Sequence, residues 1–174
     1  MTRRLILTVL ALLAATGVAE AHAGNGGFSD FGHGFVHPFS GLDHLAVMMA
    51  VGLIAARAGG RAAWLLPACF MVVMAAGGAY GLSGALLPFA EIGIAASVVV
   101  LGFLALARFR LPTALASGLA AAFALFHGYV HGAEMPLGAS ALGSGFGFLT
   151  ASALLIGVGL VLGAGRQRLE NARA

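Results

Sequence analysis

Long apolar segments are the feature that most constrains how this chain can fold. A membrane-spanning helix needs about 20 residues, because the helix rises about 1.5 Å per residue. The composition requires such helices, since 60% of the 174 residues are hydrophobic and only 9% are charged, more apolar side chains than one soluble core could bury. The sequence therefore predicts an all-α polytopic membrane helix bundle. Charges, prolines and glycine turns divide it into five transmembrane helices, at about residues 38–56, 62–81, 86–107, 111–130 and 142–165.

The N-terminal segment has the pattern of an export signal. Residues 1–21, MTRRLILTVLALLAATGVAEA, combine an arginine pair, an apolar run and small residues at Ala19 and Ala21. This pattern favours a cleaved signal peptide over a retained anchor. The next residues, 22–36, read HAGNGGFSDFGHGFV, and their glycine content favours an external lead-in over a helix. Residues 22–174 would then form a single transmembrane domain.

The basic residues indicate the orientation in the membrane. Cytoplasmic loops of membrane proteins carry an excess of Arg and Lys. Seven arginines follow the first, third and fifth segments, and all fall on one side of a five-helix chain: Arg57, Arg61, Arg108, Arg110, Arg166, Arg168 and Arg173. The net charge of +3 therefore reports topology, and we expect the lipid bilayer and no nucleic acid as a partner. The protein should lie in a bacterial inner (cytoplasmic) membrane with its N-terminus periplasmic and its C-terminus cytoplasmic.

Small residues in the apolar segments indicate close helix packing. G-x-x-x-G spacing occurs at Gly77/Gly81, Gly143/Gly147 and Gly159/Gly163. Such residues let helices approach closely in lipid, either within one bundle, which we favour, or in a homo-oligomer. The sequence GLSGALLP at residues 81–88 offers a turn, so the second and third segments should form a tight hairpin.

Ionisable side chains gather in the exported half of the predicted bundle. Counting from the cytoplasmic arginines, Asp43 and His44 lie about 20 Å up the first segment. His37, Glu91, His127 and His131 lie about 25 to 31 Å from the same side. Charged groups in a membrane-spanning helix are costly and normally pair or line a pathway. We expect the outer His37, His127 and His131 to capture an ion that Asp43 and His44 then pass on.

Their spacing brings these groups onto common helix faces. His37 and His44 are seven residues apart, on one face if a helix already runs from Pro38. His127 and His131 are four apart, and Glu134 follows three residues later. Met48, one turn below His44, adds a thioether or only packing.

The ligand types suit a borderline divalent cation. Imidazoles and carboxylates without thiolate pairs favour Ni, Co, Zn or Fe, and the single cysteine, Cys69, excludes an internal disulfide. Three alternatives remain open. Asp43 and His44 could be a structural ion pair, Glu91 could be a structural acid, and His33 could be solvated or capture ions.

Two stretches resemble a known family. HPFSGLDHLAVMMAVGL and FHGYVHGAEMP resemble the HupE/UreJ membrane proteins, which are associated with hydrogenase and urease gene clusters and regarded as nickel permeases. The resemblance extends over nearly the whole chain. The departures are mild: LAVMMAVGL replaces a more leucine-rich continuation of the first motif, and Tyr129 and Val130 occupy the variable centre of the second. It implies nickel as the transported ion, with Co²⁺ or Zn²⁺ as other candidates and no permanently bound cofactor. The metal residues would be His37, Asp43, His44, His127, His131 and Glu134, with Glu91, His33 and Met48 as weaker candidates.

These features favour a transporter over an enzyme. The sequence contains no H-E-x-x-H motif, no histidine boxes of a di-iron oxidase, and no evident nucleophile with its base. We expect a nickel permease that carries the ion from the periplasm to the cytoplasm for hydrogenase or urease maturation. One alternative is an accessory membrane protein that hands a bound ion to a partner without transport. The other is an electron carrier with a bis-histidine haem.

Overall fold

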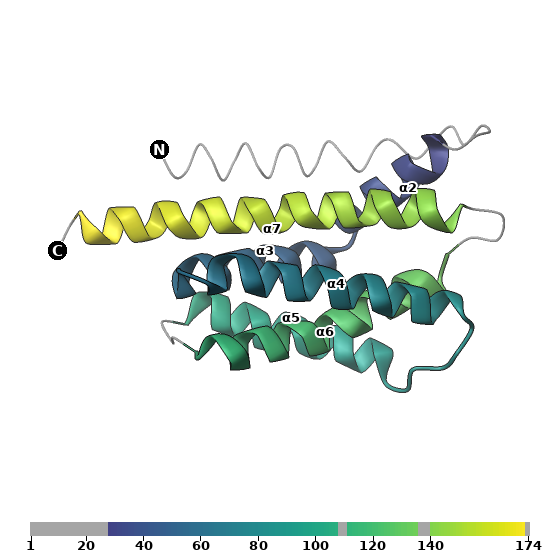
Figure 1. Ribbon diagram of the computed structural model, residues 1–174, viewed down its shortest axis with the longest axis horizontal. Coiled ribbons are helices and arrows are strands. Elements are labelled where there is room, and N and C mark those ends of the chain that lie inside the picture. The colour runs from purple at the N-terminus through teal and green to yellow at the C-terminus, as the bar shows by residue number, and fades with distance from the viewer. Residues whose placement is uncertain (1–27, 108–110, 136–139, 173–174) are drawn as a thin grey trace.

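The protein folds into a bundle of helices (Figure 1). The structure is a computed structural model and describes residues 28–107, 111–135 and 140–172. These residues form α2 (Phe28–Ser40), α3 (Leu42–Ala58), α4 (Ala62–Leu82), α5 (Ala90–Leu106), α6 (Thr113–Ala133) and α7 (Ala141–Asn171). The expected signal peptide lies outside the described residues, as do Arg108, Arg110 and Arg173.

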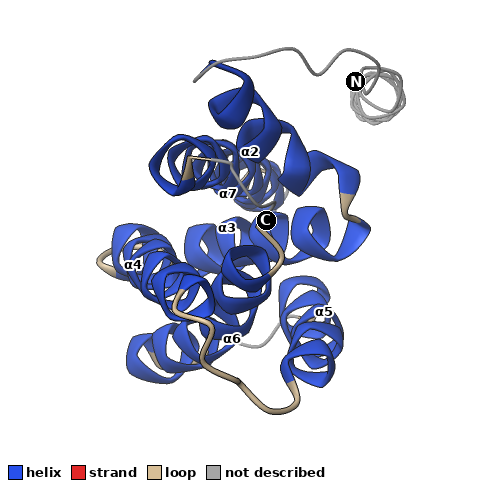
Figure 2. Cartoon of the chain, turned by 90° about the vertical axis from the view of Figure 1, so that its right-hand side faces the viewer, coloured by secondary structure: helices blue, strands red, loops and turns tan. Residues whose placement is uncertain are grey.

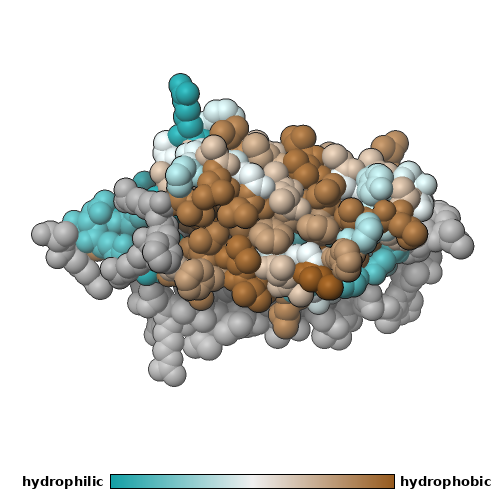
Figure 3. All heavy atoms as spheres, turned by 90° about the horizontal axis from the view of Figure 1, so that it is seen from below, coloured by the Kyte–Doolittle hydropathy of each residue, from teal (hydrophilic) through white to brown (hydrophobic). Residues whose placement is uncertain are grey.

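The helices have the length and the surface of a membrane protein. α4, α6 and α7 are long and apolar enough to cross a bilayer, and α2 with α3 makes a fourth candidate if the bent pair is one span. α5 is apolar but shorter, with 17 residues. Large hydrophobic side chains such as Trp64, Val72, Val99 and Phe103 point outward, and Figure 3 shows hydrophobic residues across the middle of one face. The expected all-helical membrane fold is therefore confirmed.

The first membrane segment differs from the prediction because it is broken. Residues 28–36 of the glycine-rich lead-in are part of α2, so the expectation of a non-helical segment was wrong for them. Pro38 lies inside α2 and not at the start of a helix, and the chain breaks at Gly41, where α3 turns by 81° from α2. Ser40 donates a hydrogen bond to the carbonyl of His37, 2.7 Å away, which satisfies a carbonyl that the ended helix leaves open. His37 and His44 consequently lie on two different helices.

Glycines hold α4 against α6. A Cβ atom added at Gly77 or Gly81 would collide with backbone of α6, and one added at Gly128 or Gly132 would collide with backbone of α4. α4 therefore packs along α6, and the tight hairpin expected of α4 with α5 is wrong. The turn chemistry is present, but the chain from Ser83 to Phe89 carries α5 away to pack on α3 and α6 (Figure 2).

α7 joins the rest of the bundle in the same way. Gly159 faces the backbone of α3 at Met49, and Gly147 faces the backbone of α2 at Phe31. The glycine pairs noted in the sequence thus serve packing within one chain, as favoured. α3 lies at the centre of the bundle, where it packs against α2, α4, α5, α6 and α7.

The ends of three helices meet at the end of the bundle where the chain passes from α3 to α4. The guanidinium of Arg57, at the end of α3, donates hydrogen bonds to carbonyls at the end of α5: Leu104 at 2.9 Å, Ala105 at 2.6 Å, and Ala107. Gln167 of α7 donates to the carbonyl of Arg57 at 3.1 Å. In Figure 1 this end lies to the left, with the C-terminal end of α7.

Candidate metal-binding site

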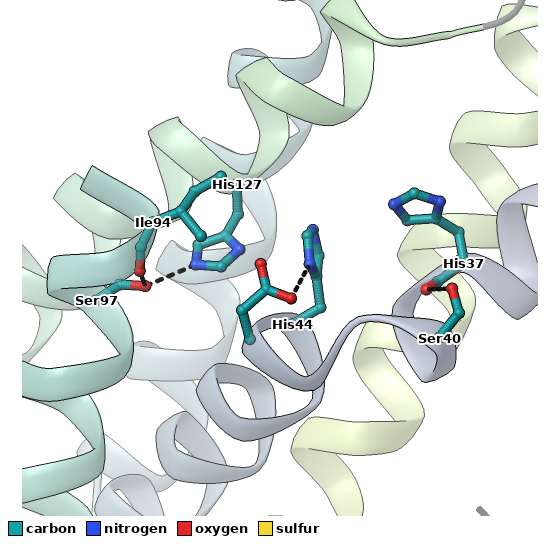
Figure 4. A network of polar contacts seen from close by, with 7 residues as sticks. His37, Ser40, His44, Ile94, Ser97 and His127 are labelled. Atoms are coloured by element: carbon teal, nitrogen blue, oxygen red, sulfur yellow. Dashed lines mark hydrogen bonds and ion pairs between the residues drawn. The ribbon is translucent and has the colours of Figure 1, made fainter. Parts of the chain in front are cut away.

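Four histidines from three helices lie next to one another in a row. His37 of α2 lies between His131 of α6 and His44 of α3, with ring centroids 4.8 and 5.5 Å away. His44 in turn faces His127 of α6 at 4.9 Å. We call His131, His37, His44 and His127 the histidine chain, and Figure 4 shows three of its members.

The break at Gly41 and one aromatic ring position the chain. The chain turns by 81° between α2 and α3. His37 and His44 therefore meet although they do not lie on one face of a single helix. Phe148 of α7 stacks on His131, with ring centroids 3.7 Å apart and planes 14° apart. The same ring lies 6.1 Å from His37 and 5.9 Å from His44. α7 therefore supplies an apolar wall against which three of the imidazoles pack.

Several nitrogens of the histidine chain are buried without a hydrogen bond. His127 is 0% exposed and His44 is 7% exposed. The atoms without a partner are His44 Nε2, His127 Nδ1 and His131 Nε2. Buried polar atoms nearly always have a partner, so three such atoms in one row call for an explanation. A neutral imidazole nitrogen with an open lone pair is a ligand for Ni²⁺, Co²⁺ or Zn²⁺, and these atoms fit that role.

The histidine chain is nevertheless not a closed metal site. Within the described ranges, no three His, Cys, Asp or Glu side chains lie close enough together to hold one ion at once. The imidazoles contact one another in successive pairs. His127 lies at the buried end of the row, next to His44, whereas its depth in the predicted helix had placed it with His37 and His131 near the entrance. That grouping was wrong because helix depth alone does not show which groups the other helices cover.

Two further side chains contact imidazoles of the histidine chain. Asp43 Oδ1 lies 3.2 Å from His44 Nδ1. The other nitrogen of the same ring, Nε2, is the one without a partner. Ser97 Oγ lies 2.8 Å from His127 Nε2. Ser97 was not predicted from the sequence, although it is the one hydroxyl side chain in the apolar α5. A lone hydroxyl in such a helix was the signal that could have identified it.

Comparison with known proteins identifies the family. A family model described as HupE / UreJ protein matches residues 10–174. The chain belongs to the HupE/UreJ family. It is similar to Protein HupE of Rhizobium leguminosarum bv. viciae, with 44% identity over 157 residues that cover 89% of this chain and 82% of that protein. No solved structure matches the chain. The resemblance seen in the two motifs is thereby confirmed.

The glycine of the first HupE/UreJ motif has a steric role. Gly41 has an extended backbone, with φ −95° and ψ 117°, which any residue could adopt. A Cβ atom there would lie 2.7 Å from Asp43 Oδ1 and 3.1 Å from His44 Nδ1. Gly41 therefore leaves room for the Asp43 and His44 pair to face each other in the first turn of α3.

The remaining predicted ligands of this HupE/UreJ protein are not members of the histidine chain. Glu91 of α5 and Glu134 at the end of α6 are exposed and line an open cavity of about 430 Å³ beside Tyr129. His33 is exposed on α2, one turn before His37. Met48 is fully buried and packs in the hydrophobic core. The structure thus brings together the four histidines and Asp43, whereas the two glutamates line a separate cavity and Met48 packs in the core.

Proposed function

We propose that this HupE/UreJ membrane protein is a permease for a divalent transition metal ion, most readily Ni²⁺. The observation that carries the proposal is the histidine chain, in which the imidazoles contact one another in successive pairs and three of the four have a buried nitrogen without a hydrogen bond. An ion held by two imidazoles can exchange one of them for the next and so advance by short steps. A closed site with four ligands would instead retain the ion.

The order of burial gives the steps a direction. His131 and His37 are partly exposed, whereas His44 and His127 are buried. We propose that the first pair receives the ion, with Glu91 and Glu134 attracting cations at the same end of the bundle. His44 and His127 then carry it inward, and Asp43 offsets the positive charge. No ATP is needed, because a membrane potential of about 100 mV, inside negative, favours entry of a divalent ion by roughly 4.6 kcal/mol.

The proposed route requires the histidine end to face the periplasm. Arg57 and Arg166 line one cavity of about 300 Å³ at the opposite end of the bundle, which suits a cytoplasmic surface. We propose five crossings in a bacterial inner membrane, with a periplasmic N-terminus after signal cleavage and a cytoplasmic C-terminus. The 17 residues of α5 rise about 26 Å, so its flanking residues or a local thinning of the bilayer must supply the rest.

The identity of the ion follows from ligand type and family resemblance together. Imidazole with a nearby carboxylate suits Ni²⁺, Co²⁺ and Zn²⁺ alike. The resemblance to proteins of hydrogenase and urease gene clusters favours Ni²⁺ destined for the maturation of one of these enzymes. The ion is cargo and not a resident cofactor, and we propose no catalytic role.

The haem alternative is less favoured by the geometry. A bis-histidine haem places its porphyrin between two axial imidazoles. Neighbouring rings in the histidine chain have centroids 4.8 to 5.5 Å apart and contact one another directly, which leaves no room for that plane.

Transport by the purified protein is the decisive test. Proteoliposomes with an inside-negative potential should accumulate Ni²⁺, and collapse of the potential should slow uptake. Excess Co²⁺ or Zn²⁺ should compete if the imidazoles are the ligands, whereas Mg²⁺ should not. Tight Ni²⁺ binding in detergent without any uptake would contradict the permease and support the accessory protein that passes its ion to a partner.

A further inference from the structure

Ser97 holds one member of the histidine chain through a fully buried contact. Ser97 and His127 are both 0% exposed, and their facing atoms, Oγ and Nε2, are 2.8 Å apart (Figure 4). The two residues lie on different helices, α5 and α6, and are thirty positions apart in the sequence. The contact therefore depends on how α5 packs against α6.

A second hydrogen bond fixes the direction of the first. Ser97 Oγ also lies 2.6 Å from the carbonyl oxygen of Ile94, one turn earlier in α5. A carbonyl oxygen can only accept, so the single hydroxyl proton of Ser97 is donated to Ile94. Ser97 Oγ must then accept from His127, which places the imidazole proton on Nε2.

The other nitrogen of His127 is consequently the one with an open lone pair. A neutral imidazole carries one proton, so Nδ1 is unprotonated when Nε2 donates. Nδ1 is the His127 atom that is buried without a hydrogen-bond partner, and the ring faces His44 at a centroid distance of 4.9 Å. The hydrogen bonding of Ser97 leaves Nδ1 unprotonated, and Nδ1 is also the nitrogen that no other group contacts by a hydrogen bond, so the two observations agree.

We propose that Ser97 is a positioning residue that fixes the tautomer and ring orientation of His127, so that Nδ1 is its metal-binding atom. The inference rests on the proposed metal transport. His44 has a similar arrangement with the two nitrogens exchanged. Asp43 contacts Nδ1 of His44 and leaves Nε2 open, whereas Ser97 contacts Nε2 of His127 and leaves Nδ1 open. Partners of this kind set the orientation of metal-binding histidines, and their loss commonly weakens metal affinity by about 10- to 100-fold.

The first test is made on metal-free protein and does not depend on transport. In ¹⁵N NMR spectra of histidine-labelled protein, His127 is assigned by the signals that a His127→Gln variant lacks. The expected result is a proton on Nε2 and none on Nδ1. A proton on Nδ1 in the wild type would overturn the proposal, whether or not the protein transports metal.

The second test measures Ni²⁺ affinity of the detergent-purified variants. Ser97→Ala should bind Ni²⁺ about 10- to 100-fold more weakly than the wild type. Ser97→Thr keeps the hydroxyl and should restore both the affinity and the Nε2–H tautomer. The matched control is Ser117→Ala, which removes another buried hydroxyl of a helix, 8% exposed and without a contact to any histidine nitrogen.

Each outcome decides one of the two proposals. Wild-type affinity in Ser97→Ala, or an equal loss in Ser117→Ala, would overturn the role of Ser97 while leaving the permease intact. A wild-type protein that binds no Ni²⁺ would instead contradict the proposed function, and the tautomer of the metal-free protein would still test the hydrogen bonding assigned to Ser97.

Discussion

Both ends of the bundle hold polar side chains that are at least partly buried, but the hydrogen bonding of these side chains differs. At one end, Arg57 donates to the carbonyls of Leu104, Ala105 and Ala107 and so completes the hydrogen bonding of the end of α5. At the other end, His44, His127 and His131 each keep a buried nitrogen without a hydrogen bond. A polar group that is satisfied by its own fold serves structure. A polar group that the fold leaves open is available to a substrate.

The difference has an energetic meaning. A buried polar atom without a partner destabilises a fold by about 1 to 3 kcal/mol. A metal ion that binds such an atom would relieve this cost, whereas the carbonyls of Leu104, Ala105 and Ala107 already accept hydrogen bonds from Arg57. Variants at the two ends should therefore separate transport from stability.

The largest effect is expected from removal of a central imidazole. His44→Ala takes away the link between His37 and His127, so Ni²⁺ uptake by proteoliposomes should be abolished while the protein remains helical and monodisperse. Leu45→Ala, at the neighbouring half-buried position, removes packing but no ligand and should retain uptake per folded molecule. Normal uptake by His44→Ala would make the pair with Asp43 structural, like the arginine end.

Acidification should weaken metal binding strongly. Histidine gains its proton within about pH 5 to 8, and only the neutral imidazole binds metal. Ni²⁺ affinity should therefore fall as the pH is lowered, approaching about tenfold per pH unit for each coordinating imidazole once the pH is below the pKa of that imidazole. A His127→Ala/His131→Ala variant should show a shallower dependence, measured by titration of detergent-purified protein. A flat profile in the wild type would point to carboxylates as the ligands.

At the arginine end, a substitution should affect stability and not metal binding. Arg57→Met keeps much of the side-chain volume but leaves carbonyls at the end of α5 without their donor. The expected cost is about 1 to 3 kcal/mol, seen as a lower midpoint of thermal unfolding in detergent. Arg61→Met, at an exposed arginine four residues later, should leave the midpoint unchanged. A loss of Ni²⁺ affinity in Arg57→Met would show that the two ends are coupled.

Much of the fold could be read from the sequence, because lipid requires long apolar helices whatever their arrangement. The five apolar segments correspond to α3, α4, α5, α6 and α7, and the small residues do pack within one bundle. The sequence did not show which helices pack against each other. The turn after α4 predicted a hairpin of α4 with α5. α4 packs instead on α6, because glycines of the two helices let their backbones approach closely. This match joins segments that are far apart in the sequence.

The candidate site was predicted in composition but not in geometry. The spacing predicted that His37 and His44 lie together, and they do meet, although across the break at Gly41 and not along one helix face. His127 and His131 were expected on one face, whereas they lie at opposite ends of the histidine chain. The two motifs could not show that Phe148 lies against three of these rings, nor that Ser97 reaches His127. Such contacts depend on packing between helices, which leaves no periodic signal in either segment.

The smallest effect is expected at the turn that holds the histidine end together. Gly41→Ala would place a Cβ atom 2.7 Å from Asp43 Oδ1 and 3.1 Å from His44 Nδ1, so the pair must shift by a few tenths of an ångström. We expect a modest loss of Ni²⁺ affinity, smaller than that of His44→Ala, with the helices intact.

The matched control for that substitution is Gly118→Ala. Gly118 lies inside α6 with open space where a Cβ would be, so alanine there should stabilise the helix by about 0.5 to 1 kcal/mol and leave Ni²⁺ affinity unchanged. Gly41 has an extended backbone that alanine adopts without strain, so a metal defect in Gly41→Ala alone would arise from the crowded Asp43 and His44 pair. If both variants bind Ni²⁺ like the wild type, that pair tolerates displacement, and the precise placement of His44 does not matter for binding.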